Sequence, residues 1–235
     1  MSERGLTAVC DPDRKVAVST GPAMIEVSGL RYGYAGRLVL SLDRWSARPG
    51  EHWLVLGASG SGKTTLLHLL AGLLSPQQGT VIVGGQDLAA LSTSARDRFR
   101  GRHVGIVPQR LHLVDCLTVV DNLLLARYLA GLPGSAADAR QTLAALGLAE
   151  KAGAYPTALS YGEAQRVAVA RAVVNGPRVI LADEPTSNLD DAHCLQALEL
   201  LQGQAARSGA TLVIATHDQR VKRRFDHQLV LEAIP

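Results

Sequence analysis

A run of small residues near position 60 has the composition and spacing of a phosphate-binding loop. It consists of Gly57, Ala58, Ser59, Gly60, Ser61, Gly62, Lys63, Thr64 and Thr65. The glycines let backbone N–H groups converge on phosphate oxygens, the lysine supplies a cation to the terminal phosphates, and the Thr64 hydroxyl suits Mg²⁺. A glycine-rich turn is the alternative, but the run also lies between a strand-like segment at 53–56 and a helix-like segment at 66–74. We therefore expect the chain to bind a nucleotide.

Two adjacent carboxylates form the second chemical signal. Asp183 and Glu184 follow the apolar residues 179–182, as in a Walker B segment. Acidic groups at the end of a buried strand are unfavourable unless a cation or water receives them, and a solvated acidic turn is the alternative. We expect Asp183 to reach the Mg²⁺ that Thr64 holds, and Glu184 to lie beside the water that attacks the terminal phosphate.

The apolar pattern outlines the elements that position these groups. The β-rich segments are residues 24–28, 38–42, 53–56, 80–83, 103–107, 179–182, 211–215 and 228–231. Helical patterns alternate with several of them. The segments at 179–182 and 212–215 have no polar face, which favours a parallel sheet covered by helices on both sides. The expected core is therefore α/β.

A helical lobe and a leader are predicted outside this core. Residues 118–131 and 135–147 look helical and are separated by Leu132, Pro133 and Gly134, which predicts a lobe at about 110–160. Residues 1–22 mix charges and prolines without periodicity, which indicates a flexible leader. The remaining residues, 23–235, are expected to form one domain.

Bulk composition excludes several classes of protein. The chain of 235 residues is 47% hydrophobic and 19% charged, and its apolar stretches are too short to cross a bilayer. The charged N-terminus predicts no secretory signal, and Cys10, Cys116 and Cys194 lie outside metal-ligand spacing, so a cytoplasmic chain with reduced thiols is expected. The net charge of +3 comes without a nucleic-acid module, and the basic cluster at 220–224 is interpreted as a solvated helix face.

Further motifs complete a family resemblance. Residues 159–163 read Leu-Ser-Tyr-Gly-Glu and lead into a helix-like segment at 164–175, Gln109 follows Val-Pro, and Thr-His-Asp occupies 216–218. With the phosphate loop, the Walker B acids and Ser-Asn-Leu-Asp at 187–190, they resemble the nucleotide-binding subunit of ABC transporters over residues 24–232. The resemblance implies the ABC ATPase fold. This fold is a P-loop NTPase core with a mixed or parallel sheet, an N-terminal antiparallel β subdomain and a helical lobe.

The resemblance also implies a site shared between two subunits, with ATP and Mg²⁺ as cofactors. Two copies would pack head to tail, so that Ser160 and Gly162 bind the terminal phosphate held by the partner. Gln109 would contact Mg²⁺ and the attacking water, His217 the terminal phosphate and that water, and Asp190 would act across the interface. A Ser at a helix N-terminus offers a hydroxyl and unpaired N–H groups to an anion, which agrees with this assignment.

An aromatic residue about two dozen positions before the loop stacks on adenine in this family. Tyr34 fits best, and Tyr32 is its rival because a strand aims both rings at one face. The common signature is Leu-Ser-Gly-Gly-Gln, whereas this chain has Tyr161 and Glu163 at the third and fifth positions. Tyrosine lacks the freedom of glycine to adopt positive φ, so binding is altered if the family requires that shape. The other motifs are intact, which predicts a homodimer with two equivalent, hydrolysing sites.

Within the superfamily, the chain most resembles ATPases of the lipoprotein-release and macrolide-export type. These proteins work with a separate integral membrane permease, so the chain is expected on the inner face of the cell membrane. An apolar patch at Leu111, Leu113, Val114 and Leu117 would meet that partner, or belong to the lobe core. The alternative is a mechanotransmission module without transport, as in cell-division relatives. A DNA-repair ATPase is disfavoured because no long coiled coil or zinc-binding cysteine set is present.

Overall fold

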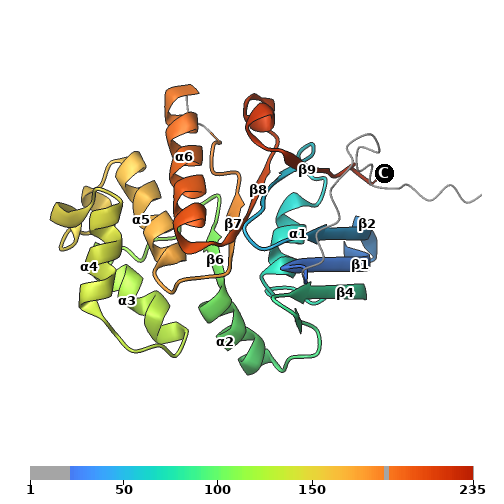
Figure 1. The fold of residues 1–235 in the computed structure, drawn as a ribbon, viewed down its shortest axis with the longest axis horizontal. Helices are drawn as coiled ribbons and strands as arrows, with labels where there is room; N and C mark the ends of the chain where they lie inside the picture. The colour runs from blue at the N-terminus through green and yellow to red at the C-terminus, as the bar shows by residue number, and fades with distance from the viewer. Residues whose placement is uncertain (1–21, 188–190, 235) are drawn as a thin grey trace, which may run out of the picture.

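The computed structural model describes residues 22–187 and 191–234. The expected leader therefore lies outside the described residues except for Pro22, and Asp190 lies outside them too. Three regions follow one another across Figure 1: an antiparallel sheet, a parallel sheet with its covering helices, and a group of helices. The P-loop NTPase core and the antiparallel subdomain expected from the sequence are both present.

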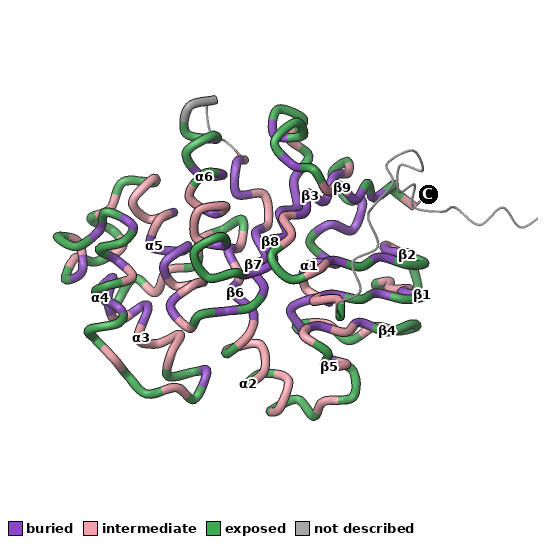
Figure 2. Tube along the Cα trace, viewed as in Figure 1, coloured by how far each residue is buried: buried purple, intermediate pink, exposed green. Residues whose placement is uncertain are grey.

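The N-terminal region is an antiparallel sheet in the order β2-β1-β4-β5. Its strands are β1 (Ile25–Tyr34), β2 (Arg37–Ala47), β4 (Gln78–Val83) and β5 (Gln86–Asp87). Ile25, Val27 and Leu30 of β1 are fully buried, while alternate residues near the start of the strand face solvent. This alternation, visible in Figure 2, is that of a sheet with one covered face.

The second sheet is parallel, with the order β6-β7-β8-β3-β9. Its strands are β3 (His52–Leu56), β6 (Val104–Val107), β7 (Val179–Asp183), β8 (Thr211–Thr216) and β9 (His227–Val230). In the register, Leu56 lies opposite Thr216, and Asp183 lies opposite Ala215. Because parallel strands end at one edge, the loops after β3, β7 and β8 emerge side by side.

Helices cover both faces of the parallel sheet. Helix α1 (Lys63–Leu70) lies between the two sheets, where Leu66, Leu69 and Leu70 join a common core with Ile25 and Leu40. Helix α6 (Asp191–Ser208) covers the other face together with α5 (Tyr161–Val173). Figure 1 shows α6 and α1 on opposite sides of β7 and β8.

The remaining helices include the predicted lobe, which has its own core. They are α2 (Thr93–His103), α3 (Val119–Leu129), α4 (Ala136–Ala145), and the short helices η1 (Ala149–Lys151), η2 (Pro156–Ala158) and η3 (Gln219–Arg224). Leu123, Leu143 and Val167 pack together there. The expected helices at 118–131 and 135–147 are confirmed as α3 and α4. Helix α5 begins at Tyr161, three residues before the predicted 164, because Ser160 caps it.

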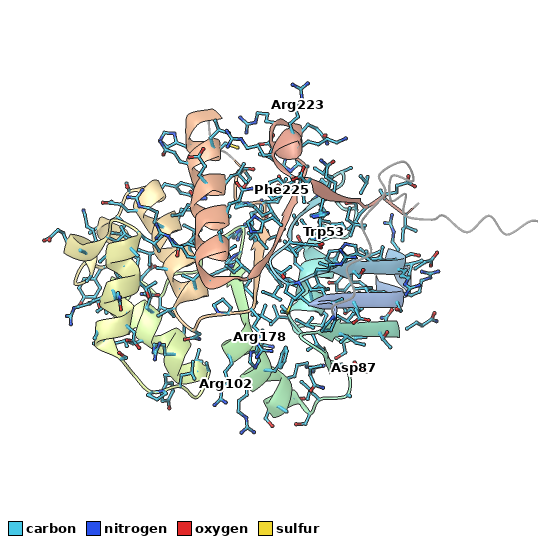
Figure 3. All side chains as sticks on the ribbon, viewed as in Figure 1. Trp53, Asp87, Arg102, Arg178, Arg223 and Phe225 are labelled. Atoms are coloured by element: carbon cyan, nitrogen blue, oxygen red, sulfur yellow. The ribbon has the colours of Figure 1, made fainter. Side chains whose placement is uncertain are left out.

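Two minor predictions concern thiols and the basic cluster. Cys116 and Cys194 are free thiols, as expected for reduced cysteines, and Cys10 lies outside the described residues. The basic cluster forms η3, in which Val221 is buried and Arg223 points away from the body (Figure 3). In the described part of the chain, no helix combines the length and apolar character needed to span a membrane.

Candidate nucleotide site

The predicted phosphate loop joins the end of β3 to the start of α1. Gly60 and Gly62 have φ of 81° and 89°, the left-handed region that glycine enters without strain. A Cβ on Gly57 would lie 2.2 Å from Ser61 Oγ, so the loop also requires glycine there for lack of space. Gly62 is the N-cap of α1 and provides no side-chain acceptor for the first turn. The N-terminus of α1 therefore keeps N–H groups available for an anion.

Lys63 is held at the centre of this loop. Its side chain is only 6% exposed, and Nζ donates to the carbonyls of Gly57 at 2.8 Å and Ala58 at 3.0 Å. Nζ also lies 3.5 Å from Glu184 Oε1. The ammonium is thus fixed at the loop, where it can meet a phosphate, and a carboxylate is its present counter-ion.

Thr64 and Asp183 form a pair with the chemistry of a magnesium site. Thr64 Oγ1 donates to Asp183 Oδ2 at 2.8 Å. Asp183 Oδ1 is buried and has no hydrogen-bond partner among residues 22–187 and 191–234. Burial, and then the nearby charge of Glu184, raise the pKa of Asp183 above its usual value. A hydroxyl beside a carboxylate with one unpartnered oxygen in the described part of the chain fits Mg²⁺, which prefers oxygen ligands.

Glu184 is held in a strained conformation by its neighbours. Its φ is 47°, a left-handed backbone that costs a non-glycine residue about 1–3 kcal/mol. Thr216 Oγ1 donates to Oε2 at 2.9 Å, and His217 Nδ1 lies 2.9 Å from Oε1. The carboxylate is only 10% exposed. Strain of this kind persists where contacts fix the side chain, and it is concentrated at functional sites.

These groups line one open cavity of about 390 Å³. The lining residues come from five separate segments and are Val39, Ser59, Gly60, Gly62, Lys63, Thr64, Thr65, Gln109, Glu184 and His217. The volume lies in the range of small-molecule sites. The structure therefore brings the predicted loop, Gln109, Glu184 and His217 together around one space. Asp183 is not a lining residue, and it reaches this site through its hydrogen bond with Thr64.

Other predicted site residues lie elsewhere. Ser160 and Gly162 stand at the N-terminus of α5 and do not line this cavity. Tyr34 is half exposed and contacts Tyr32 edge to face, with ring centroids 5.2 Å apart. The two rings share a face as predicted, and neither lines the cavity. Asp190 lies outside the described residues. One chain thus brings together most of the residues that the sequence predicts to bind phosphate and metal.

The unusual signature segment forms a regular helix start. Tyr161 is the first residue of α5 and is absent from the residues with positive φ in the described ranges, so tyrosine is accommodated there without strain. Ser160 Oγ accepts from the Glu163 N–H at 3.3 Å, and the Ser160 N–H donates to Glu163 Oε2 at 2.8 Å. Such a reciprocal capping box stabilises a helix N-terminus.

Several supporting side chains were not predicted from the sequence. The buried Gln165 donates to the carbonyl of Pro185 at 2.7 Å, which links α5 to the Walker B loop. Arg171 donates to the carbonyls of Leu111 and His112 at 2.7 and 2.6 Å, and so braces the segment after Gln109. A glutamine or arginine within a helix resembles any solvated residue in sequence, so only the placement of α5 reveals these contacts.

Comparisons with known proteins agree with this geometry. The family described as "ABC transporter" matches residues 41–187. The lipoprotein-releasing system ATP-binding protein LolD of Chromohalobacter salexigens is 38% identical over 222 residues, covering 92% of this chain and 94% of that protein. The methionine import ATP-binding protein MetN of Caulobacter vibrioides is 42% identical over 205 residues, which are 86% of this chain and 61% of that protein.

Solved structures resemble the fold over almost its whole length. The dimeric post-hydrolysis state of the ATP-binding cassette MJ0796, bound to ADP and Pi, has a TM-score of 0.76 at 29% identity and covers 90% of this chain and 97% of that one. CbiO1 from Clostridium perfringens, part of the transporter complex cbiONQ, has a TM-score of 0.79 at 27% identity and covers 91% of this chain and 87% of that one.

Proposed function

Because the chain belongs to the ABC transporter family as an ATP-binding subunit, we propose that it powers export or extraction of a substrate through a separate membrane subunit. It is an ATPase, and its cassette energises an ABC transporter. The observation that carries the residue assignment is the convergence of Lys63, Thr64, Gln109, Glu184 and His217 on one cavity. The proposal therefore concerns how these residues act and which partners they serve.

The phosphates of ATP bind to the loop and to Lys63. The N–H groups at the start of α1 and the ammonium of Lys63 bind the terminal phosphates. Thr64, Asp183 and Gln109 would hold Mg²⁺, which would neutralise charge on the phosphate oxygens. The buried Oδ1 of Asp183, which has no hydrogen-bond partner in the part of the chain that the structure describes, supports this assignment.

Glu184 acts on the attacking water. When phosphates engage Lys63, Oε1 of Glu184 loses its cationic neighbour at 3.5 Å and keeps its contact with His217 Nδ1. Its remaining lone pair can then accept a proton from water. Thr216 keeps hold of the other oxygen, so the carboxylate stays aimed. His217 orients Glu184 through Nδ1 and contacts the terminal phosphate with its exposed edge. The water then attacks in line with the departing ADP.

The second half of each site comes from another copy of the chain. Ser160 and Gly162 bind the terminal phosphate of the partner, and Asp190 acts across the interface. The separation of Ser160 from the cavity of its own chain supports this arrangement, as does the dimeric state of the related cassette. Tyr34, with Tyr32 as its rival, stacks on adenine. Two equivalent sites form in a head-to-tail homodimer.

The membrane partner is a permease that moves or extracts lipoproteins. The similarity to LolD over 92% of this chain supports this choice of partner. The chain then lies in the cytoplasm, on the inner face of the cell membrane. Leu111, Leu113, Val114 and Leu117 are only partly buried, which suits contact with a permease at the segment after Gln109.

A substitution of the general base tests the proposed chemistry. Glu184→Gln removes the proton acceptor and leaves the phosphate loop intact, so hydrolysis falls at least about a hundredfold while ATP binding persists. On addition of ATP, the Glu184→Gln protein then accumulates as a dimer, which is measured by light scattering after size-exclusion chromatography. Glu199→Gln, which removes an exposed carboxylate of α6, is the matched control and hydrolyses ATP normally. A Glu184→Gln protein with the normal rate overturns the assignment.

A further inference from the structure

The signature segment carries an ion pair that the proposed chemistry does not use. Lys151, the last residue of η1, places Nζ 3.2 Å from Glu163 Oε1. The other oxygen of Glu163 accepts from the Ser160 N–H at 2.8 Å and from Ser160 Oγ at 2.9 Å. Each carboxylate oxygen thus has its own partner, one on the lobe and one at the helix cap.

This arrangement puts a negative charge where an anion has to arrive. Ser160 Oγ gives its one proton to Glu163, so a phosphate oxygen that binds this hydroxyl has to take the proton over from the carboxylate. That oxygen then lies within two hydrogen-bond lengths, about 6 Å, of Glu163. The hydrogen bond from the Ser160 N–H is the largest of the effects that lower the pKa of Glu163 to about 2. Glu163 is therefore ionised throughout the working pH range, and protonation does not relieve its repulsion of the phosphate.

Positive charge near Glu163 determines how strong that repulsion is. Within the described residues, Lys151 is the cation that forms an ion pair with Glu163. Arg166 lies one turn further along α5, and its Nη1 is 3.9 Å from where a Cβ on Gly162 would be. It forms no ion pair with Glu163 in the described ranges. Removal of Lys151 would leave the carboxylate facing the phosphate without its nearest counter-ion.

We propose that Lys151 is a positioning residue for the ATP held by the partner subunit. Its ammonium neutralises Glu163, so that an acidic signature segment accepts the terminal phosphate on Ser160. The inference rests on the proposed function, because it requires Ser160 to face a nucleotide across a dimer. A role in folding alone is disfavoured, since the side chain of Lys151 is 41% exposed and exposed ion pairs contribute little to stability.

A double-mutant cycle tests the proposal. The parent is the Glu184→Gln protein, and the measurement is the ATP concentration that gives half-maximal dimer in light scattering. Lys151→Met raises this concentration about two- to fivefold, and Lys151→Arg restores it. In the Glu163→Gln background, Lys151→Met has no further effect, because the charge that it offsets is gone.

Controls separate this role from a structural one. Arg140→Met removes one positive charge from the exposed face of α4 in the same lobe and leaves the ATP requirement unchanged. With Glu184 intact, Lys151→Met raises KM for ATP with little change in kcat, and its melting temperature stays at that of the parent.

Three outcomes would contradict the proposed role of Lys151, and one of them would also contradict the proposed dimer. If Lys151→Met leaves the ATP requirement unchanged in a parent that dimerises, this inference fails and the proposed function stands. If the shift is equally large in the Glu163→Gln background, Lys151 acts through another group and the inference fails. A parent that binds ATP but stays monomeric overturns the proposed dimer, and this inference with it.

Discussion

At the residue scale, Glu184 depends on a neighbour whose hydroxyl is fully buried. Thr216 is 0% exposed and donates to Oε2. Thr216→Val keeps the shape and removes this donor, so the carboxylate of Glu184 is less well aimed. We expect kcat to fall about tenfold with ATP affinity unchanged, as measured by steady-state hydrolysis and equilibrium binding.

A threonine at the other end of β8 provides the control. Thr211 is also buried, and its hydroxyl bonds to backbone groups of Arg48 and Gly50. Thr211→Val therefore lowers stability and leaves kcat unchanged. Equal losses of kcat in both variants would show that the effect of Thr216→Val comes from general disturbance of β8.

Asp183 gives a pH-dependent prediction of definite sign. Its pKa is raised in the folded chain by burial, so the folded state binds more protons than the unfolded state near that pKa. Stability therefore falls as pH rises from the unfolded value through the folded one. Without Mg²⁺ and nucleotide, Asp183→Asn raises the melting temperature at pH 7 by about 2–4 °C and flattens this pH dependence, as measured by calorimetry.

The exposed Asp115→Asn is the matched control for that change. It removes the same charge and is expected to leave the melting temperature unchanged. An Asp183→Asn protein less stable than the parent would mean that the carboxylate is satisfied without metal.

At the element scale, α5 connects three parts of the site. It carries Ser160 at its cap, Gln165 against the Walker B loop, and Arg171 against the segment after Gln109. Arg171→Met leaves two carbonyls without their donor and lowers the free energy of unfolding by about 1–3 kcal/mol. Chemical denaturation measures this loss, and Arg140→Met on α4 is the control without an effect. An unchanged stability in Arg171→Met would show that water replaces the guanidinium.

Helix α5 also illustrates which parts of the fold the sequence pattern predicts and which it does not. The strands and the lobe helices were predictable because apolar runs and alternation report burial directly. The sequence pattern predicts the start of α5 three residues too late, because the pair Tyr161 and Gly162 is typical of a loop. Its capping box depends on Glu163 folding back onto Ser160. Strand β1 runs on to Tyr34, beyond the predicted 28, because its pairing with β2 continues through Leu30 and Tyr32 and resumes after a register shift at Tyr32 and Gly33.

At the scale of the whole molecule, the residues of the cavity other than Val39 were predictable, and their mutual contacts were not. The types and order of Lys63, Asp183 and His217 indicate phosphate chemistry. The ion pair of Lys63 with Glu184 depends on the register of β3, β7 and β8, which is set by the packing of the entire sheet. The domain limits at 22 and 23 and the role of Asp190 stay predictions.

The resting ion pair between Lys63 and Glu184 makes nucleotide binding an exchange of anions on one cation. In the proposed mechanism, the phosphate displaces a carboxylate that the chain itself supplies, and Glu184 becomes available as a base at the moment when substrate is present. Once phosphate departs, Glu184 can pair with the ammonium of Lys63 again. The carboxylate therefore competes with the phosphate product for this cation. On the proposed roles of Lys63 and Glu184, readiness for hydrolysis is coupled to nucleotide occupancy, and the vacant site is favoured at the end of each turnover.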